Sequence, residues 1–266
     1  MSIGLSTYAY FWRGSERVAR PMDLSDMIRD TAALGLGLFQ ICDWPALDTM
    51  DDRELAGIRE LASSLRVRLE LGTRGLDPDH LRRQIAIATA LGATLLRSMW
   101  TAGDDRPAPA EAERRVREVL PDLEAAGVTL ALETYEQVRT DALVELVRSI
   151  DSASVGICLD PANTVANLEL PAQVTERCAP FVVNWHVKDF DFSRAPGWVG
   201  FALAGTALGH GRLDYDAMRE AIRPEERGIS QIIEFWLPWQ QDEETTTRRE
   251  AEWTAITIDY LRSRND

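Results

Sequence analysis

The chain has 266 residues, of which 45% are hydrophobic and 27% are charged, and its formal net charge is −14. This composition is typical of a globular protein with a sizeable core, and the negative charge argues against a nucleic-acid partner, because phosphate contacts need clustered Lys and Arg. Three widely spaced cysteines provide neither a disulfide framework nor a CxxC metal site. The first residues lack a secretion signal, and no apolar run reaches the length of a membrane span. We therefore expect a cytoplasmic enzyme or binding protein without a membrane partner.

Eight short apolar runs recur along the chain, and each is followed by an amphipathic stretch. Runs of this length that are hydrophobic nearly throughout predict strands covered on both faces. The runs lie at residues 2–11, 37–44, 67–74, 94–100, 128–135, 154–161, 181–190 and 229–239.

The segments between these runs carry helix start and stop signals. One opens on Asp23 and closes on Gly35, and another opens on Asp77 and closes on Gly92. Eight alternating strand and helix units predict an α/β protein, a single-domain (β/α)8 TIM barrel over residues 1–266. A doubly wound open sheet is the alternative, but it usually has a glycine-rich turn after its first strand, and "STYAYFWRG" is not such a turn.

The last four predicted strands each end in a side chain that can bind a metal: Glu133, Asp160, His186 and Glu234. Catalytic groups of a TIM barrel lie where the strands end, so these four would converge on one face. Three carboxylates and one imidazole suit a single divalent ion, for which we expect Mn²⁺, with Mg²⁺, Co²⁺ or Zn²⁺ as alternatives. A salt bridge or loop cap is the competing role for each residue alone. Agreement across four consecutive units favours the metal.

The sequence resembles the xylose-isomerase-like TIM-barrel superfamily, the sugar phosphate isomerases and epimerases, over essentially its whole length. The stretches that carry the resemblance are "LALETYE", "GICLDPAN", "WHVKDF", "GHGRLDY" and "IIEFW". The resemblance implies one divalent metal held by Glu133, Asp160, His186 and Glu234. In the ketose 3-epimerases of that family the two glutamates also act as acid and base, which here makes Glu133 and Glu234 the candidate catalytic pair.

Two positions depart from the family pattern. Epimerases often carry a histidine where this chain has Asn163, and a glutamate or similar residue where it has His210. Relatives with the same metal site decarboxylate or dehydrate oxo-sugars. We expect a metal-dependent isomerase or epimerase of a ketose or related sugar, with a lyase, decarboxylase or dehydratase of an oxo-sugar or sugar acid as the alternative. The substrate would be a small molecule, and the family also allows a homo-oligomer.

The chemistry explains why both reactions remain open. A metal that grips the carbonyl oxygen stabilises an enediolate as charge develops, and two glutamates on opposite faces could remove and return a proton. Loss of CO₂ from a β-oxo acid gives the same enediolate, so the four ligands alone do not separate an isomerase from a decarboxylase. A sugar-binding protein without activity and a three-zinc endonuclease of the same fold are weaker alternatives. Three histidines are too few for the endonuclease.

Lys188 is the only lysine of the chain and lies two residues beyond His186. It therefore points to the same side if the strand continues. There it could act in catalysis, donating to the developing oxyanion or holding a substrate carboxylate. The competing role is a buried ion pair with Asp189 or a glutamate that braces the ligands.

Further substrate contacts are expected around the barrel mouth. The candidate substrate-binding residues are Glu136, Asn163, His210, Trp12, Trp44 and Arg194. The two tryptophans follow strand ends, where flat rings could stack on a sugar, although core packing is the competing role for each. Arg97 and Arg194 could bind a carboxylate or phosphate, but surface roles are favoured for both, and we expect His80 to be solvated. The Gly- and aromatic-containing segment 191–214 predicts an ordered loop that packs over the mouth or touches a partner subunit.

Overall fold

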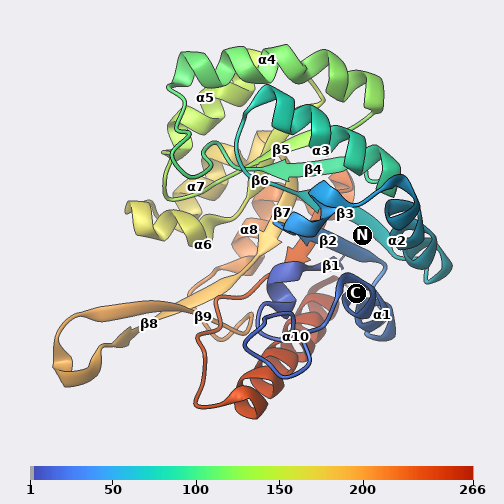
Figure 1. Cartoon of the computed structure of the whole chain (residues 1–266). Helices are drawn as coiled ribbons and strands as arrows, with labels where there is room; N and C mark the ends of the chain where they lie inside the picture. Colours follow the sequence, from blue (N-terminus) through green and yellow to red (C-terminus); the bar gives the residue numbers. More distant parts are fainter. Residues whose placement is uncertain (1–2, 266) are drawn as a thin grey trace.

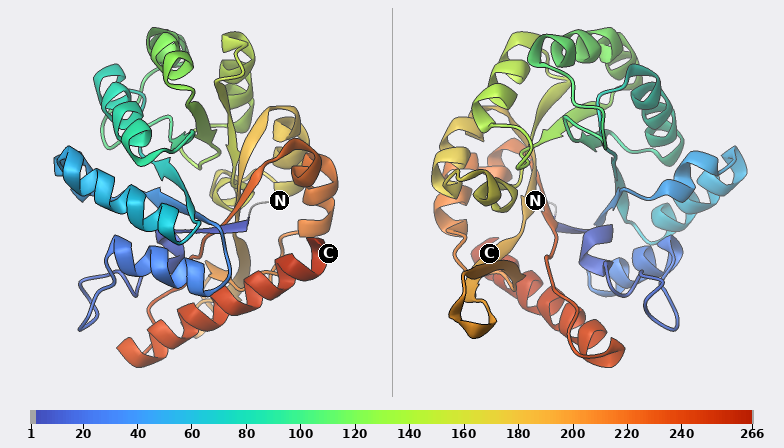
Figure 2. Two further views of the ribbon diagram at one scale, coloured as in Figure 1. Left: turned by 90° about the vertical axis from the view of Figure 1, so that its right-hand side faces the viewer. Right: turned by 60° about the vertical axis from the view of Figure 1, so that its left-hand side comes forward.

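Eight parallel strands close into a barrel that is surrounded by helices (Figures 1 and 2). The computed structural model describes residues 3–265, apart from the side chains of Pro196 and Asn265. The barrel strands are β1 (Ile3–Ser6), β2 (Leu38–Cys42), β3 (Arg68–Gly72), β4 (Leu95–Ser98), β5 (Thr129–Glu133), β6 (Val155–Leu159), β7 (Val182–Val187) and β10 (Ser230–Ile233). Their order around the barrel is β1-β10-β7-β6-β5-β4-β3-β2. The predicted (β/α)8 barrel is confirmed.

The helices follow the strands along the chain and cover the outside of the barrel (Figure 2). The α-helices are α1 (Leu24–Ala33), α2 (Asp52–Ser64), α3 (Pro78–Leu91), α4 (Pro109–Ala126), α5 (Thr140–Ile150), α6 (Pro161–Thr164), α7 (Pro171–Cys178), α8 (Tyr215–Ile222), α9 (Pro224–Arg227) and α10 (Glu243–Asn265). Short 3-10 helices are η1 (Thr7–Tyr10), η2 (Pro45–Thr49), η3 (Val165–Asn167), η4 (Ala179–Phe181) and η5 (Pro196–Trp198). Every helix in the described part of the chain is too short or too polar to cross a lipid bilayer.

The helix boundaries follow from local chemistry. The Asp23 side chain accepts from the backbone N–H of Asp26 and caps α1, as Asp77 caps α3 by accepting from His80. Helix α3 ends at Gly92, which adopts the left-handed conformation at φ 72° that a side chain disfavours. These caps fix the length of each helix, and therefore where the next strand starts.

The first predicted run is only partly a strand. Residues 3–6 form β1, but Thr7–Tyr10 turn into the 3-10 helix η1, where the Ser6 side chain accepts from the backbone N–H of Tyr8. A serine cap therefore ends the strand earlier than apolar content alone suggests. This turn directs Tyr8 and Phe11 toward the barrel mouth, where both line a cavity.

The segment predicted as a loop over the mouth is a β-hairpin. Strands β8 (Asp189–Arg194) and β9 (Phe201–Thr206) pair antiparallel and project away from the barrel (Figure 1). The middle of β9 reaches the mouth, where Leu203 and Ala204 line the cavity. The tip is solvent-exposed, and Trp198 keeps 77% of its surface accessible.

Candidate active site

The four predicted metal ligands lie at the carboxyl-terminal ends of β5, β6, β7 and β10. Glu133 is the last residue of β5, Asp160 directly follows β6, and Glu234 directly follows β10. His186 lies within β7, one residue before its end. All four side chains are almost completely buried. The parallel barrel therefore brings residues up to 101 positions apart in the sequence to one place.

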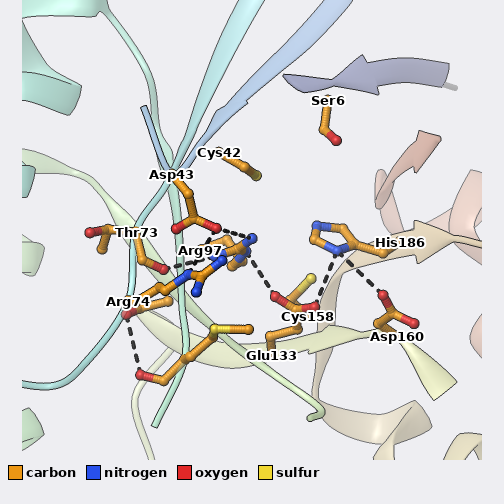
Figure 3. A network of polar contacts seen from close by, with 12 residues as sticks. Ser6, Cys42, Asp43, Thr73, Arg74, Arg97, Glu133, Cys158, Asp160 and His186 are labelled. Atoms are coloured by element: carbon orange, nitrogen blue, oxygen red, sulfur yellow. Dashed lines mark hydrogen bonds and ion pairs between the residues drawn. The ribbon is translucent and has the colours of Figure 1, made fainter. Parts of the chain in front are cut away.

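The imidazole of His186 faces all three carboxylates. Its Nδ1 lies 3.4 Å from Oε2 of Glu234, 3.6 Å from Oε1 of Glu133 and 3.8 Å from Oδ2 of Asp160. Figure 3 shows the ring directed at Glu133 and Asp160. Ligand atoms of Glu133, Asp160 and His186 all lie within 4.8 Å of one another. These three residues could hold one cation. Glu234, predicted as the fourth ligand, lies beside His186 but falls outside this group of mutually close ligand atoms.

The charges at this centre favour a bound cation. Among the described residues, Nδ1 of His186 has no hydrogen-bond partner, although it is buried among carboxylate oxygens. Burial alone would lower the pKa of His186, but its interactions with Cys158, Glu234 and Glu133 raise it well above its usual value. Burial also raises the pKa of Asp160 to about 6, despite the opposing charge of Lys188. Oxygen donors with one nitrogen fit Mn²⁺, Mg²⁺ or Co²⁺.

Arg97 is buried beside the centre, which contradicts the surface role favoured from the sequence. Its side chain is 2% exposed, and its Nε lies 2.9 Å from Oε2 of Glu133. Its other nitrogens contact the carbonyl oxygen of Thr73 at 2.8 Å and Oδ2 of Asp43 at 3.4 Å (Figure 3). Against the effect of burial, the positive charges of Arg97 and His186 lower the pKa of Glu133. The sequence missed this role because an arginine near a strand end is most often solvated.

Lys188 is also buried and pairs with two of the carboxylates. Its Nζ lies 2.6 Å from Oδ2 of Asp160 and 3.4 Å from Oε2 of Glu234, and 4.6 Å from the centre of the Trp236 ring. Against the effect of burial, His186 and Lys188 together lower the pKa of Glu234. The alternative pairing with Asp189 is not found.

Both glutamates have partners on each of their oxygens. Oε1 of Glu133 accepts from Nδ2 of Asn163 at 2.7 Å, while Oε2 faces Arg97. Oε1 of Glu234 accepts from Oγ of Ser6 at 2.9 Å, while Oε2 faces Lys188. Each glutamate is therefore held by a buried cation at one oxygen and by a hydrogen-bond donor at the other.

A cavity of about 410 Å³ opens above the centre. Its lining combines polar and apolar side chains, which is typical of a small-molecule site. The polar lining comes from Tyr8, Arg74, Arg97, Glu133, Tyr135, Asn163, Lys188 and Glu234. The apolar lining comes from Phe11, Met99, Leu203, Ala204, Phe235, Trp236, Leu237 and Pro238. Tyr8, Tyr135 and Phe11 were not singled out from the sequence, where only their position near strand ends marks them.

The two tryptophans proposed to stack on substrate lie outside this cavity. The indole N–H of Trp12 donates to the carbonyl oxygen of Leu237 at 2.6 Å, and its ring packs against Trp239. Trp44 lines two neighbouring depressions, of about 260 and 440 Å³. Trp236 is the tryptophan that lines the cavity above the centre.

Two other candidates also lie elsewhere. The guanidinium of Arg194 lies over the rings of Phe201 and Trp198 on the exposed hairpin, so its surface role is the one observed. Glu136 is half-buried on the loop after β5, next to Tyr135, and is not part of the cavity lining. Burial raises the pKa of Glu136. His80, expected to be solvated, is half-buried and contacts Oγ1 of Thr73 at 2.6 Å.

The glycines around His210 dock a loop onto Asp189. The Asp189 carboxylate accepts from the backbone N–H groups of Gly209, Gly211 and Leu213 at 2.9–3.0 Å. A Cβ on Gly211 would collide with Oδ1 of Asp189. His210 itself is exposed and does not line the cavity. The "GHG" motif therefore has a structural reason that does not involve the histidine side chain.

Comparison with known proteins identifies the family. A family model described as xylose isomerase-like TIM barrel matches residues 28–257. The chain belongs to the xylose isomerase-like TIM-barrel family. Within it, the chain is 50% identical over 265 residues to 3-oxo-isoapionate decarboxylase of Pectobacterium atrosepticum, covering 100% of this chain and 96% of that protein.

Solved structures share the fold at lower identity. D-psicose 3-epimerase from Clostridium cellulolyticum H10, solved with D-tagatose, has a TM-score of 0.76 at 15% identity over 99% of each chain. A xylose isomerase-like TIM barrel protein from Mycobacterium smegmatis, solved in complex with magnesium, has a TM-score of 0.69 at 18% identity, over 97% of this chain and 96% of that one. The barrel of this chain is thus shared with an epimerase, while half of its sequence is shared with a decarboxylase.

Proposed function

We propose that this protein is a metal-dependent decarboxylase of a 3-oxo sugar acid, of the class that 3-oxo-isoapionate represents. Identity of 50% along the whole chain to a decarboxylase supports this substrate class. This is the alternative reading of the sequence, and we prefer it to the epimerase reading for a reason that lies in the site.

The observation that carries the proposal is the pairing of both glutamates with buried cations. An epimerase needs a carboxylate that can take a proton from carbon, and a second one that can return it. Arg97 lies 2.9 Å from Glu133 and Lys188 lies 3.4 Å from Glu234, so both carboxylates are stabilised in their charged form and are weak bases. Decarboxylation requires no base, because the bond that breaks releases its electron pair as CO₂ leaves.

The charge balance suits an anionic substrate. Three carboxylates and the two cations Arg97 and Lys188 leave one net negative charge, which a divalent cation would change to one net positive charge. A divalent cation held by Glu133, Asp160 and His186, with Glu234 as the expected fourth ligand, would supply positive charge that stabilises a developing oxyanion. A β-oxo acid anion is attracted to such a site, whereas a neutral ketose is not.

The residues of the chain have separate roles in this reaction. The bond between the carboxylate and the carbon beside the ketone breaks, its electrons move into the keto group to give an enolate as CO₂ leaves, and a proton from solvent water then adds to the carbon. Lys188 donates to the enolate oxygen, and Asn163 holds Glu133 in place through its 2.7 Å hydrogen bond. The apolar wall that includes Phe235 and Trp236 receives the uncharged CO₂.

The test is a product analysis in D₂O with Mn²⁺-loaded protein. A 3-oxo sugar acid labelled with ¹³C at its carboxylate should release labelled CO₂ and give a ketose with one deuterium at the new C–H. A panel of ketoses, tested in parallel, should show neither epimers nor rapid C–H exchange. Epimerisation of a ketose without any CO₂ release from the oxo acids would contradict the proposal and would support a ketose epimerase instead.

A further inference from the structure

A layer of polar side chains fills the barrel interior beneath His186. Gln40 of β2, Glu70 of β3, Asn184 of β7 and Ser230 of β10 all point inward and are at most 6% exposed. The interior of a TIM barrel is usually packed with branched apolar side chains. A buried carboxylate also carries a large desolvation cost unless it is hydrogen-bonded. This layer therefore needs an explanation beyond packing.

Glu70 is the acceptor at the centre of the layer. Its Oε2 accepts from Nε2 of Gln40 and from Nδ2 of Asn184, each at 3.0 Å. Its Oε1 accepts from Oγ of Ser230 at 2.6 Å. Nε2 of Gln40 makes a second hydrogen bond to Oδ1 of Asn184 at 3.1 Å. Three donors from three strands thus converge on one carboxylate.

This geometry fixes which way the Gln40 amide points. A carboxylate can only accept, so the amide group that faces Glu70 is the NH₂. The amide oxygen must then face the opposite way, toward His186, whose Nε2 lies 2.8 Å from it. An amide oxygen can only accept, so Nε2 of His186 is the ring nitrogen that carries a hydrogen. In a neutral ring Nδ1 is then left with its lone pair, and Nδ1 is the nitrogen that faces the three carboxylates.

We propose that Glu70 and Gln40 are positioning residues that fix His186 as the Nε2–H tautomer and so direct its Nδ1 lone pair to the metal. This inference rests on the proposed metal-dependent function. Glu70 acts through Gln40 and touches neither His186 nor the cavity. The hydrogen bonds that join Glu70, Gln40 and His186 extend from β3 through β2 to β7. The strand register pairs Gln40 directly with Glu70.

Four variants separate this role from simple packing. Gln40→Met and Glu70→Met keep the side-chain volume nearly constant. The first removes the acceptor for Nε2 of His186, and the second removes the carboxylate that orients the Gln40 amide. Glu70→Gln keeps an oxygen for both amides and an NH₂ that can donate to Ser230, so it preserves the orientation without the charge. Ser230→Ala removes one hydrogen bond from the same buried layer without touching the amide of Gln40.

The first readout is Mn²⁺ affinity, measured by calorimetry on the full chain. Gln40→Met and Glu70→Met should bind Mn²⁺ roughly 10- to 100-fold more weakly than the unsubstituted protein, while Glu70→Gln and Ser230→Ala should bind it nearly as well. Unchanged affinity in both Met variants would overturn the inference. Equal losses in Glu70→Gln and Glu70→Met would also overturn it, because charge and not orientation would then be responsible.

The second readout is the tautomer, and it needs no substitution. The chain has only three histidines, so ¹⁵N-labelled imidazole signals of the Zn²⁺-loaded protein can be assigned with His80 and His210 as references. His186 should carry its hydrogen on Nε2, and a hydrogen on Nδ1 would contradict the inference even if a Met variant failed to fold. An unsubstituted protein that binds neither Mn²⁺ nor Zn²⁺ would instead defeat the proposed metal-dependent function, and the tautomer would then be read in the metal-free protein at a pH high enough to leave the ring neutral.

Discussion

Nζ of Lys188 lies 2.6 Å from Oδ2 of Asp160, and both groups are buried at the candidate metal centre. The only lysine of the chain thus neutralises one expected metal ligand directly and a second, Glu234, at 3.4 Å. A buried pair of this kind is destabilising when one partner is lost. We therefore expect Lys188 to affect both the stability of the protein and the rate of the proposed reaction.

Replacement of Lys188 by Met tests both effects. The metal-free Lys188→Met variant should unfold with a free energy lower by about 3 kcal/mol, because Asp160 and Glu234 would lose their buried partner. Added Mn²⁺ should restore much of that loss, and thermal unfolding with and without Mn²⁺ measures both values. In the metal-loaded variant kcat should fall by about 100-fold, as expected when a donor to an oxyanion is removed. A normal kcat in the loaded variant would mean that Lys188 only braces the ligands.

Replacement of Arg97 should change which reaction the site performs. Arg97→Met would leave Oε2 of Glu133 without its cation at 2.9 Å, so the carboxylate becomes a stronger base. We expect slower decarboxylation and faster exchange of the product C–H in D₂O, followed by NMR. Arg97→Lys keeps the charge and serves as the control. Its product C–H should exchange more slowly than that of Arg97→Met. Parallel losses of both rates in Arg97→Met would argue that the arginine only holds the fold.

Metal affinity should rise with pH between about 5 and 7. Burial raises the pKa of Asp160 to about 6, and the interactions of His186 with Cys158, Glu234 and Glu133 overcome burial and raise its pKa well above the usual value. Both groups thus hold protons in the metal-free protein at low pH, and ligands must lose them to bind a metal. Calorimetry in buffers of different ionisation enthalpy should therefore detect proton release on Mn²⁺ binding at pH 6. An affinity that does not change over this range would contradict the assigned ligands.

The "GHG" motif offers a separate test on stability. Gly211→Ala should lower the free energy of unfolding by about 1–3 kcal/mol, because the added Cβ meets the Asp189 carboxylate and the carbonyl oxygen of Phe190. His210→Ala should leave both stability and KM nearly unchanged, because the side chain is exposed. Chemical denaturation and steady-state kinetics measure the two outcomes. A large rise in KM for His210→Ala would restore its predicted contact with substrate.

The barrel and the ligand positions could be predicted from the sequence because they depend on periodic features. Apolar runs recur in each unit and helix caps in several of them, and a charged residue after a buried run is conspicuous, as Glu234 is after "QII". The side-chain contacts around them could not be predicted. Arg97 looks like any surface arginine until the barrel closes and places it between Asp43 and Glu133.

The polar interior layer was missed for a similar reason. Glu70 lies between two leucines in "LEL" and Gln40 lies in "LFQIC", so each interrupts an apolar strand by one residue. Alternation along a strand does place Asn184 on the same side as His186, and this spacing was an available signal. The convergence of Gln40, Asn184 and Ser230 on Glu70 depends on strands that are far apart in sequence, and only the closed barrel reveals it.

The central claim is that a divalent metal at Glu133, Asp160 and His186 enables decarboxylation of a 3-oxo sugar acid. The most direct measurement is CO₂ release from such an acid by protein treated with a chelator, dialysed and then reloaded with Mn²⁺. We expect CO₂ release to stop after chelation and to return with Mn²⁺. A His186→Ala variant that remains folded should release no CO₂. Undiminished CO₂ release from the metal-free protein would contradict it.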